Sequence, residues 1–174
     1  MSHFTTTHNT SGQAIFSPNL PTEPSKLPIP IGTLERLSTT HHFPPDLSTE
    51  ADVEQYAHDR TNASFPGSRR IGPENGTASF ILSLKPGAGV HGGGMHRTTT
   101  LDVIVVLEGE VGMELDSGEK RVLKAGDSVV QRATMHRWVN VTPDEGWARM
   151  VAFVQVVAEP IKVGGEELWS EWVS

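Results

Sequence analysis

Short apolar segments with strand periodicity dominate the second half of the chain. Between residues 77 and 84 the apolar side chains alternate and fall on one face, namely Ala78, Phe80, Leu82 and Leu84. Further apolar runs at residues 101–107, 128–130 and 148–157 are separated by turns rich in glycine and acidic residues. Strands that follow each other at such short intervals in the sequence are typical of an antiparallel sandwich or barrel. The run at 148–157 is apolar on both faces and predicts a buried central strand.

The N-terminal region has a different pattern. Eight of the twelve prolines lie before residue 67, which excludes long regular elements there. The region predicts an extended arm with a small hairpin leading into residues 14–16 and a strand at 31–40. Hydroxyl and acidic residues at the start of residues 48–57 predict a short capped helix.

At the C-terminal end, apolar residues lie at helical spacing, namely Leu168, Trp169, Trp172 and Val173. They predict a short amphipathic helix that docks on the body. The predicted organisation is therefore an arm and a helix over residues 1–74, a β core over 75–158, and a tail with a helix over 159–174.

Composition narrows the possible partners. The net charge of −7 argues against nucleic acid and against an acidic membrane surface, because binding to phosphates needs an excess of lysine and arginine. The absence of cysteine excludes disulfides and thiolate metal sites. No run has the length of a membrane span, and the first residues do not have the pattern of a secretory signal. A cytoplasmic protein is therefore expected.

Candidate chemistry is concentrated between residues 95 and 140. Side chains two apart on a strand share a face, so His96, Thr98 and Asp102 are predicted to project to one side of a single strand. His136 and Trp138 share a face in the same way. If both faces line the interior of a barrel, two imidazoles and one carboxylate converge there. This set suits non-haem Fe(II), Mn or Zn. The alternative is a metal-free cluster joined by hydrogen bonds.

The same stretch resembles a small single-domain cupin of the cupin-2 type. Residues 89–109 follow the frame of the family's first motif, with Gly109 as its turn glycine. The second motif is matched by Gly126, Asp127, residues 131–133, His136 and Asn140. The residues from Met95 to Thr98, then Asp102, then Val106 to Glu110, are similar to a subgroup in fungi and bacteria. Fungal members of that subgroup often accompany polyketide biosynthetic enzymes. The resemblance implies an all-β jelly-roll barrel, a homodimer and a small-molecule substrate.

This sequence departs from the family at two ligand positions. His96 and His136 match the first and third histidines, but Thr98 stands where the second histidine is expected. Asp102 stands where the family has glutamate, and it is shorter by one methylene. The resemblance therefore implies a divalent metal (Fe, Mn, Zn or Ni) held by His96, Asp102 and His136, or a pocket that has lost its metal. His91 is a candidate replacement for the missing imidazole.

Other side chains are candidates for a substrate pocket, namely Thr98, Gln131, Trp138 and Arg149. Gln131 and Arg149 would hold an acidic or phenolic substrate at the mouth, and Trp138 would form an aromatic wall. The predicted function is a cupin enzyme of secondary metabolism, an oxidoreductase or lyase acting on a carbonyl, phenolic or polyketide-derived molecule. Catalysis would involve His96, Asp102 and His136, with a metal as Lewis acid or with imidazole as general acid or base. The alternative is a non-catalytic module that binds a small molecule in the same pocket.

Overall fold

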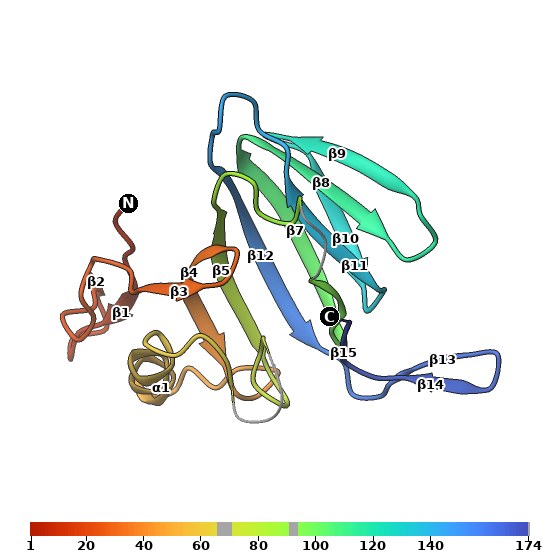
Figure 1. Cartoon of the computed structure of the whole chain (residues 1–174). Coiled ribbons are helices and arrows are strands. Elements are labelled where there is room, and N and C mark those ends of the chain that lie inside the picture. The colour runs from red at the N-terminus through yellow and green to blue at the C-terminus, as the bar shows by residue number, and fades with distance from the viewer. Residues whose placement is uncertain (66–70, 91–93, 174) are drawn as a thin grey trace.

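Two antiparallel sheets form the body of the computed structural model, which describes residues 1–65, 71–90 and 94–173 (Figure 1). The larger sheet has the strand order β10 (Ser128–Arg132), β7 (Thr100–Glu108), β12 (Ala148–Val156), β5 (Thr77–Leu84), β4 (Gly32–Thr40) and β3 (Lys26–Ile29). The smaller sheet has the order β15 (Glu171–Val173), β6 (Met95–Arg97), β11 (His136–Asn140), β8 (Glu110–Leu115) and β9 (Lys120–Lys124). The prediction of an all-β fold is confirmed.

The hydrophobic core lies on the faces that the two sheets turn toward each other. From β5 and β12 it takes alternate side chains, namely Ala78, Phe80, Leu82, Leu84, Ala148, Met150, Ala152 and Val154. From β8 and β11 it takes Val111, Met113 and Trp138. This alternation follows from the two-residue period of a strand. The inward face predicted for residues 77–84 is therefore confirmed.

The N-terminal arm contributes β4 and the edge strand β3 to the larger sheet, and it adds a hairpin and a helix beside this edge (Figure 1). The hairpin pairs β1 (Thr6–His8) with β2 (Ala14–Phe16), and the helix α1 spans Ala51–Asp59. The hydroxyl of Thr7 donates a hydrogen bond to the carboxylate of Glu50, which precedes α1. The hairpin, the strand predicted at residues 31–40 and the helix predicted at 48–57 are confirmed to within a few residues at their ends.

The C-terminal segment forms strands, so the predicted C-terminal helix is wrong. β13 (Ile161–Val163) and β14 (Glu166–Leu168) form a hairpin around Gly164 and Gly165. Both glycines have positive φ, 61° and 88°, as a two-residue turn of this kind requires. β15 then pairs with β6. The edge of β6 offers backbone groups that a helix would leave unpaired, and this pairing overrides the helical spacing of the apolar residues.

β12 is central in its sheet, but only one of its faces is buried. Met150, Ala152 and Val154 lie in the core, whereas Phe153 is 50% exposed on the opposite face. Phe153 pairs with Val103, which is 41% exposed. The prediction that both faces are buried is therefore wrong, because the described residues place no second layer over this part of the sheet. A homodimer stays a prediction.

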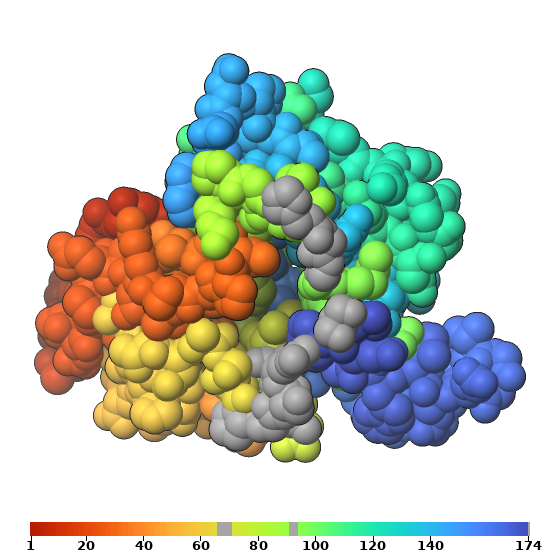
Figure 2. Space-filling model, viewed as in Figure 1, coloured from red at the N-terminus to blue at the C-terminus, as the bar shows by residue number. Residues whose placement is uncertain are grey.

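The face shown in Figure 2 is hollowed between the N-terminal strands, α1 and the C-terminal tail. α1 has nine residues, and among the described residues no helix is long and apolar enough to cross a bilayer.

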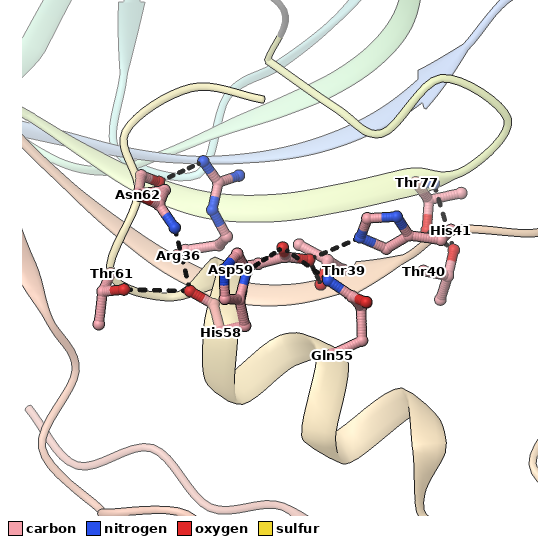
Figure 3. Close-up of polar contacts among 10 residues, drawn as sticks. All are labelled: Arg36, Thr39, Thr40, His41, Gln55, His58, Asp59, Thr61, Asn62 and Thr77. Carbon is pink, nitrogen blue, oxygen red and sulfur yellow. Dashed lines mark hydrogen bonds and ion pairs between the residues drawn. The ribbon is translucent and has the colours of Figure 1, made fainter. Parts of the chain in front are cut away.

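A buried carboxylate attaches the end of α1 to β4 (Figure 3). Oδ2 of Asp59 accepts hydrogen bonds from Thr39 Oγ1 and His41 Nε2, both at 2.7 Å. Its Oδ1 accepts a hydrogen bond from Gln55 Nε2 at 3.1 Å. Burial alone would raise the pKa of Asp59, but the donors on His41, Thr39 and Gln55 outweigh it, so the pKa lies below its ordinary value. These bonds hold the helix against the sheet.

Candidate functional site

The two predicted site histidines are neighbours on adjacent strands of the smaller sheet. His96 on β6 lies directly opposite His136 on β11. Their ring centroids are 4.4 Å apart, with 48° between the ring planes. Residues that face each other across an antiparallel pair point to the same side of the sheet. The two imidazoles therefore form a contiguous pair.

His96 is held by a backbone carbonyl and an aromatic ring. Its Nδ1 lies 2.6 Å from the carbonyl oxygen of Gly94. A carbonyl oxygen can only accept, so Nδ1 carries the hydrogen and Nε2 keeps a free lone pair. The indole of Trp172 on β15 stacks on the imidazole at 5.6 Å and 11°. Burial lowers the pKa of His96, and the hydrogen bond to Gly94 offsets part of that effect.

His136 is more deeply buried and has two competing partners. Its Nδ1 lies 2.9 Å from the carbonyl oxygen of Thr134 and 2.6 Å from Nε2 of Gln131. The carbonyl only accepts and the amide nitrogen only donates, so each partner selects a different tautomer. Burial and the nearby His96 lower the pKa of His136 to about 4, although the bond to Thr134 acts in the opposite direction. His136 is therefore neutral at pH 7.

Asp102 lies in the other sheet, so His96 and Asp102 do not share one strand as predicted. β6 ends at Arg97, and the chain passes through Thr98 and Thr99 before β7 begins. Asp102 is 4% exposed and pairs with Gln131 across β10. It therefore shares a face with the amide that contacts His136.

The carboxylate of Asp102 is under-satisfied. Its Oδ1 is buried and has no hydrogen-bond partner among the described residues. Burial raises the pKa of Asp102 to about 7, with a smaller opposing effect from the Thr100 hydroxyl. A buried carboxylate with one unpartnered oxygen favours its protonated form, so the pKa of Asp102 lies near neutral pH.

The predicted three-ligand metal set does not fit this arrangement. Two imidazoles come together, but across residues 1–65, 71–90 and 94–173 no three His, Asp or Glu side chains lie close enough to share an ion. The third predicted ligand, Asp102, projects from the opposite sheet, beside Gln131. His91 lies outside the described residues. A mononuclear site of the facial type needs all three protein ligands around one ion.

The remaining predicted pocket residues separate into two groups. Gln131 contacts His136 directly, and the indole of Trp138 meets the His136 ring edge-on at 5.4 Å. Thr98 is buried, and its hydroxyl lies 2.8 Å from that of Thr100. Arg149 does not join them: it alternates with the core residue Met150 and lies 3.8 Å from the exposed carboxylate of Glu108.

Two residues at this site, Trp172 and Thr134, were not predicted from the sequence. Trp172 was assigned to a docking helix, whereas the structure places its ring on His96. Thr134 contributes a backbone carbonyl, and its side-chain hydroxyl donates a hydrogen bond to Gln131 Oε1 at 2.7 Å. A carbonyl has no signature in a sequence. A signal for Trp172 existed in the alternation of the final residues, which also fits a strand.

Comparison with known proteins gives one family. The model of the cupin domain matches residues 80–153. The chain is 37% identical over 169 residues to the phomopsin biosynthesis cluster protein C' of Diaporthe leptostromiformis, covering 95% of this chain and 82% of the relative. It is 30% identical to the cupin-domain-containing oxidoreductase fogC of Aspergillus ruber, covering 94% of this chain and 75% of the relative. Among solved structures, an RmlC-like cupin from Shewanella frigidimarina matches with a TM-score of 0.49 at 18% identity, covering 79% of this chain and 87% of that chain.

Proposed function

Because the chain belongs to the cupin-domain family, we propose that it is an enzyme of secondary metabolism acting on a small carbonyl, phenolic or polyketide-derived molecule. Its reaction centre is the group formed by His96, His136 and Asp102, and the step that these residues support is proton transfer. Oxidation of a phenol, decarboxylation, and cyclisation with dehydration all contain such a step. The names of relatives, which include cupin-domain-containing oxidoreductases, support an enzyme role.

One observation carries this proposal: the pKa of the buried acid is raised, whereas the pKa of the buried base is lowered. The pKa of Asp102 is raised to about 7, and the pKa of His136 is lowered to about 4. At pH 7 the Asp102 carboxyl is therefore partly protonated while the His136 imidazole is neutral. Oppositely displaced titratable groups are the usual sign of an acid and base pair.

The two partners of Nδ1 allow either tautomer of the neutral His136 ring. When its Nδ1 hydrogen points to the carbonyl of Thr134, Nε2 is a free base. When Nδ1 accepts from Gln131, Nε2 carries the hydrogen and can only donate a hydrogen bond. His96 stays in one tautomer, with Nε2 as a base, because Gly94 offers only an acceptor. The roles follow: His96 and His136 receive a proton at Nε2, and Asp102 returns one.

A proton-transfer test follows from these roles. In D2O, we expect the protein to accelerate incorporation of deuterium at the acyl methyl group of 2,4-dihydroxyacetophenone. Mass spectrometry measures the rate of this incorporation. His136→Gln and Asp102→Asn each lower this rate by at least about 100-fold, the range that general acid and base catalysis supplies. Lys85→Gln, a change at an exposed position, leaves it unchanged. Equal rates in all four proteins would favour a non-catalytic binding module.

Metal analysis separates the two chemical alternatives. Tag-free protein is assayed for Fe, Mn, Zn and Ni, and the exchange rate is measured before and after a chelator. The proposal expects the rate to survive chelation. An equimolar metal whose removal abolishes exchange would contradict the metal-independent step and restore the predicted ligand set.

A further inference from the structure

A cavity of about 530 Å³ reaches the residues that hold His136. It lies between β9 and β10, the edge strands of the two sheets (Figure 1). Gln131 and Thr134 line it, and both contact Nδ1 of His136. Gln131 is only 1% exposed, so its amide forms part of the inner wall. Cavities of 300–1,000 Å³ are the usual size for small-molecule sites.

The walls of this cavity are apolar between its inner and outer ends. They include Met113 and Leu115 from β8, Val129 from β10 and Ile161 from β13. Ile161 belongs to the C-terminal hairpin, so this hairpin completes one side of the cavity. Apolar walls with a few polar groups at the inner end are typical of sites that bind the body of an organic molecule and orient one end of it.

The outer part of the cavity is cationic, although the protein as a whole is acidic. Lys120, Arg121 and Arg132 line the cavity together with a single acid, Glu119. The net charge of the lining is thus +3 − 1 = +2, in a chain whose net charge is −7. Lys120 is 3.0 Å from Glu114, and Arg121 is 3.9 Å from Glu119. Arg132 has no ion-pair partner in the part of the chain that the structure describes.

We infer that this cavity binds a hydrophobic carboxylic acid, with its apolar body between β8 and β10 and its carboxylate at the rim formed by Arg121 and Arg132. The guanidinium group pairs with a carboxylate through two parallel hydrogen bonds, which favours it at such a rim. The end of the ligand opposite the carboxylate meets the buried amide of Gln131, one hydrogen bond from His136. The inference rests on the proposed function only for the reaction at the end of the ligand near Gln131. Binding of the ligand is independent of turnover.

Gln131 is then a positioning residue as well as part of the wall. Its Nε2 donates to the carbonyl of Thr134 at 2.5 Å and faces Nδ1 of His136 at 2.6 Å. A ligand that hydrogen-bonds to the Thr134 carbonyl or to Gln131 competes with His136 for these partners. Occupancy of the cavity therefore changes the tautomer balance of His136.

The test uses 6-hydroxy-2-naphthoate as the probe and its carboxamide as the neutral control, both followed by fluorescence titration. At low ionic strength the wild-type chain binds the carboxylate about tenfold more tightly than the amide. The double variant Arg121→Gln, Arg132→Gln brings this ratio close to one while the affinity for the amide is unchanged. The matched control, Lys26→Gln with Lys85→Gln, removes the same charge from exposed positions elsewhere and keeps the ratio.

A second variant tests the cavity rather than the rim. Ile161→Trp fills the cavity from the hairpin side and lowers the affinity for both probes at least tenfold, with the melting temperature confirming that the barrel is folded. In ¹⁵N spectra of the wild-type protein, the imidazole signals of His136 shift when the naphthoate binds. An unchanged ratio in the rim variant, an equal loss in the control variant, unchanged affinities in Ile161→Trp, or unmoved His136 signals would each overturn the inference.

The two proposals fail in different ways. Asp102→Asn is expected to lose deuterium exchange while keeping the preference for the carboxylate. If the wild-type protein shows the preference but no exchange, the proposed function fails and the cavity assignment stands. If exchange is present without the preference, only the cavity assignment fails.

Discussion

Two clusters in this barrel are built from the same residue types and behave in opposite ways. One contains Asp59 and His41 at the end of α1, and the other contains Asp102 and His136, which both lie beside Gln131. Both aspartates are 4% exposed. Asp59 accepts three hydrogen bonds from side chains, and the pKa of its carboxyl is lowered. Asp102 has a buried oxygen without a partner, and its pKa rises to about 7.

Burial alone therefore does not mark a functional carboxylate. Burial raises the pKa of both groups, and the number of donors then decides the net direction. The satisfied cluster contributes stability, because each partner would lose its bond on unfolding. The unsatisfied cluster lowers stability, and such sites persist where function needs a reactive group.

The largest expected effect on folding comes from exchanging each carboxylate for its amide. Asp59→Asn removes the charged acceptor of Thr39 and His41 and lowers the free energy of unfolding by about 2 kcal/mol, the range for hydrogen bonds to charged groups. Asp102→Asn at pH 8 leaves that free energy equal to or above the wild-type value, because it removes a buried charge that has an oxygen without a donor. Urea denaturation of the three proteins measures both differences. A larger loss in Asp102→Asn than in Asp59→Asn would reverse the comparison.

The second prediction concerns how stability depends on pH. The pKa of Asp102 rises from 3.8 to about 7 on folding, so the stability that it contributes at low pH is lost as pH rises from about 4 to about 7. The pKa of His136 falls from 6.5 to about 4, so its contribution is present above pH 6.5 and is lost as pH falls toward 4. The two slopes oppose each other across one window. Wild-type stability is therefore nearly flat there with respect to this pair.

Single variants expose each slope. In Asp102→Asn the melting temperature rises as pH increases from 4 to 6.5, because only the His136 effect remains. In His136→Gln it falls between pH 4 and 7. Asp59 does not contribute in this window, because the pKa of its carboxyl is lowered from 3.8 and its stabilisation is lost only in stronger acid. Parallel profiles in the two variants would show that the acid and base are not displaced in opposite directions.

The sequence predicted the strands well because a two-residue period survives wherever one face of a sheet is buried. β5, β7, β10 and β12 all lie where the apolar runs placed them. The sequence-based prediction failed where the local pattern fits both a helix and a strand, because tertiary contacts then decide which of them forms. The final residues fit a helix or a strand by spacing, and the free edge of β6 selected the strand.

The sequence predicted that some of the site's side chains lie together, but it did not predict their arrangement. His96, His136 and Gln131 do come together. Asp102 is in the opposite sheet because the chain turns between β6 and β7. The sequence did not reveal this turn, because no glycine or proline marks it. The count of donors around a carboxylate depends on neighbours from other strands. The sequence therefore does not show that the carboxylate of Asp59 is fully hydrogen-bonded and that of Asp102 is not.

The smallest expected effect concerns Trp172, which covers the histidine pair from the C-terminal strand. Burial is the main cause of the lowered pKa of His96, and the stacked indole contributes to that burial. Trp172→Ala therefore raises the pKa of His96 toward 6.5, as desolvation is relieved. Titration of the His96 resonance by NMR measures this shift.

Trp169 provides the matched control because its side chain is 59% exposed on the same tail. Trp169→Ala leaves the pKa of His96 unchanged, and it leaves the pairing of β15 with β6 intact, since only the backbone carbonyl of Trp169 bonds to Arg97. In the exchange assay Trp172→Ala shifts the pH profile with a change of a few-fold in rate, because the base is altered but still present. An equal shift in both variants would mean that the tail acts by holding β6 in place. A shift confined to Trp172→Ala would show that stacking keeps His96 neutral, which is the condition that the acid and base pair requires at pH 7.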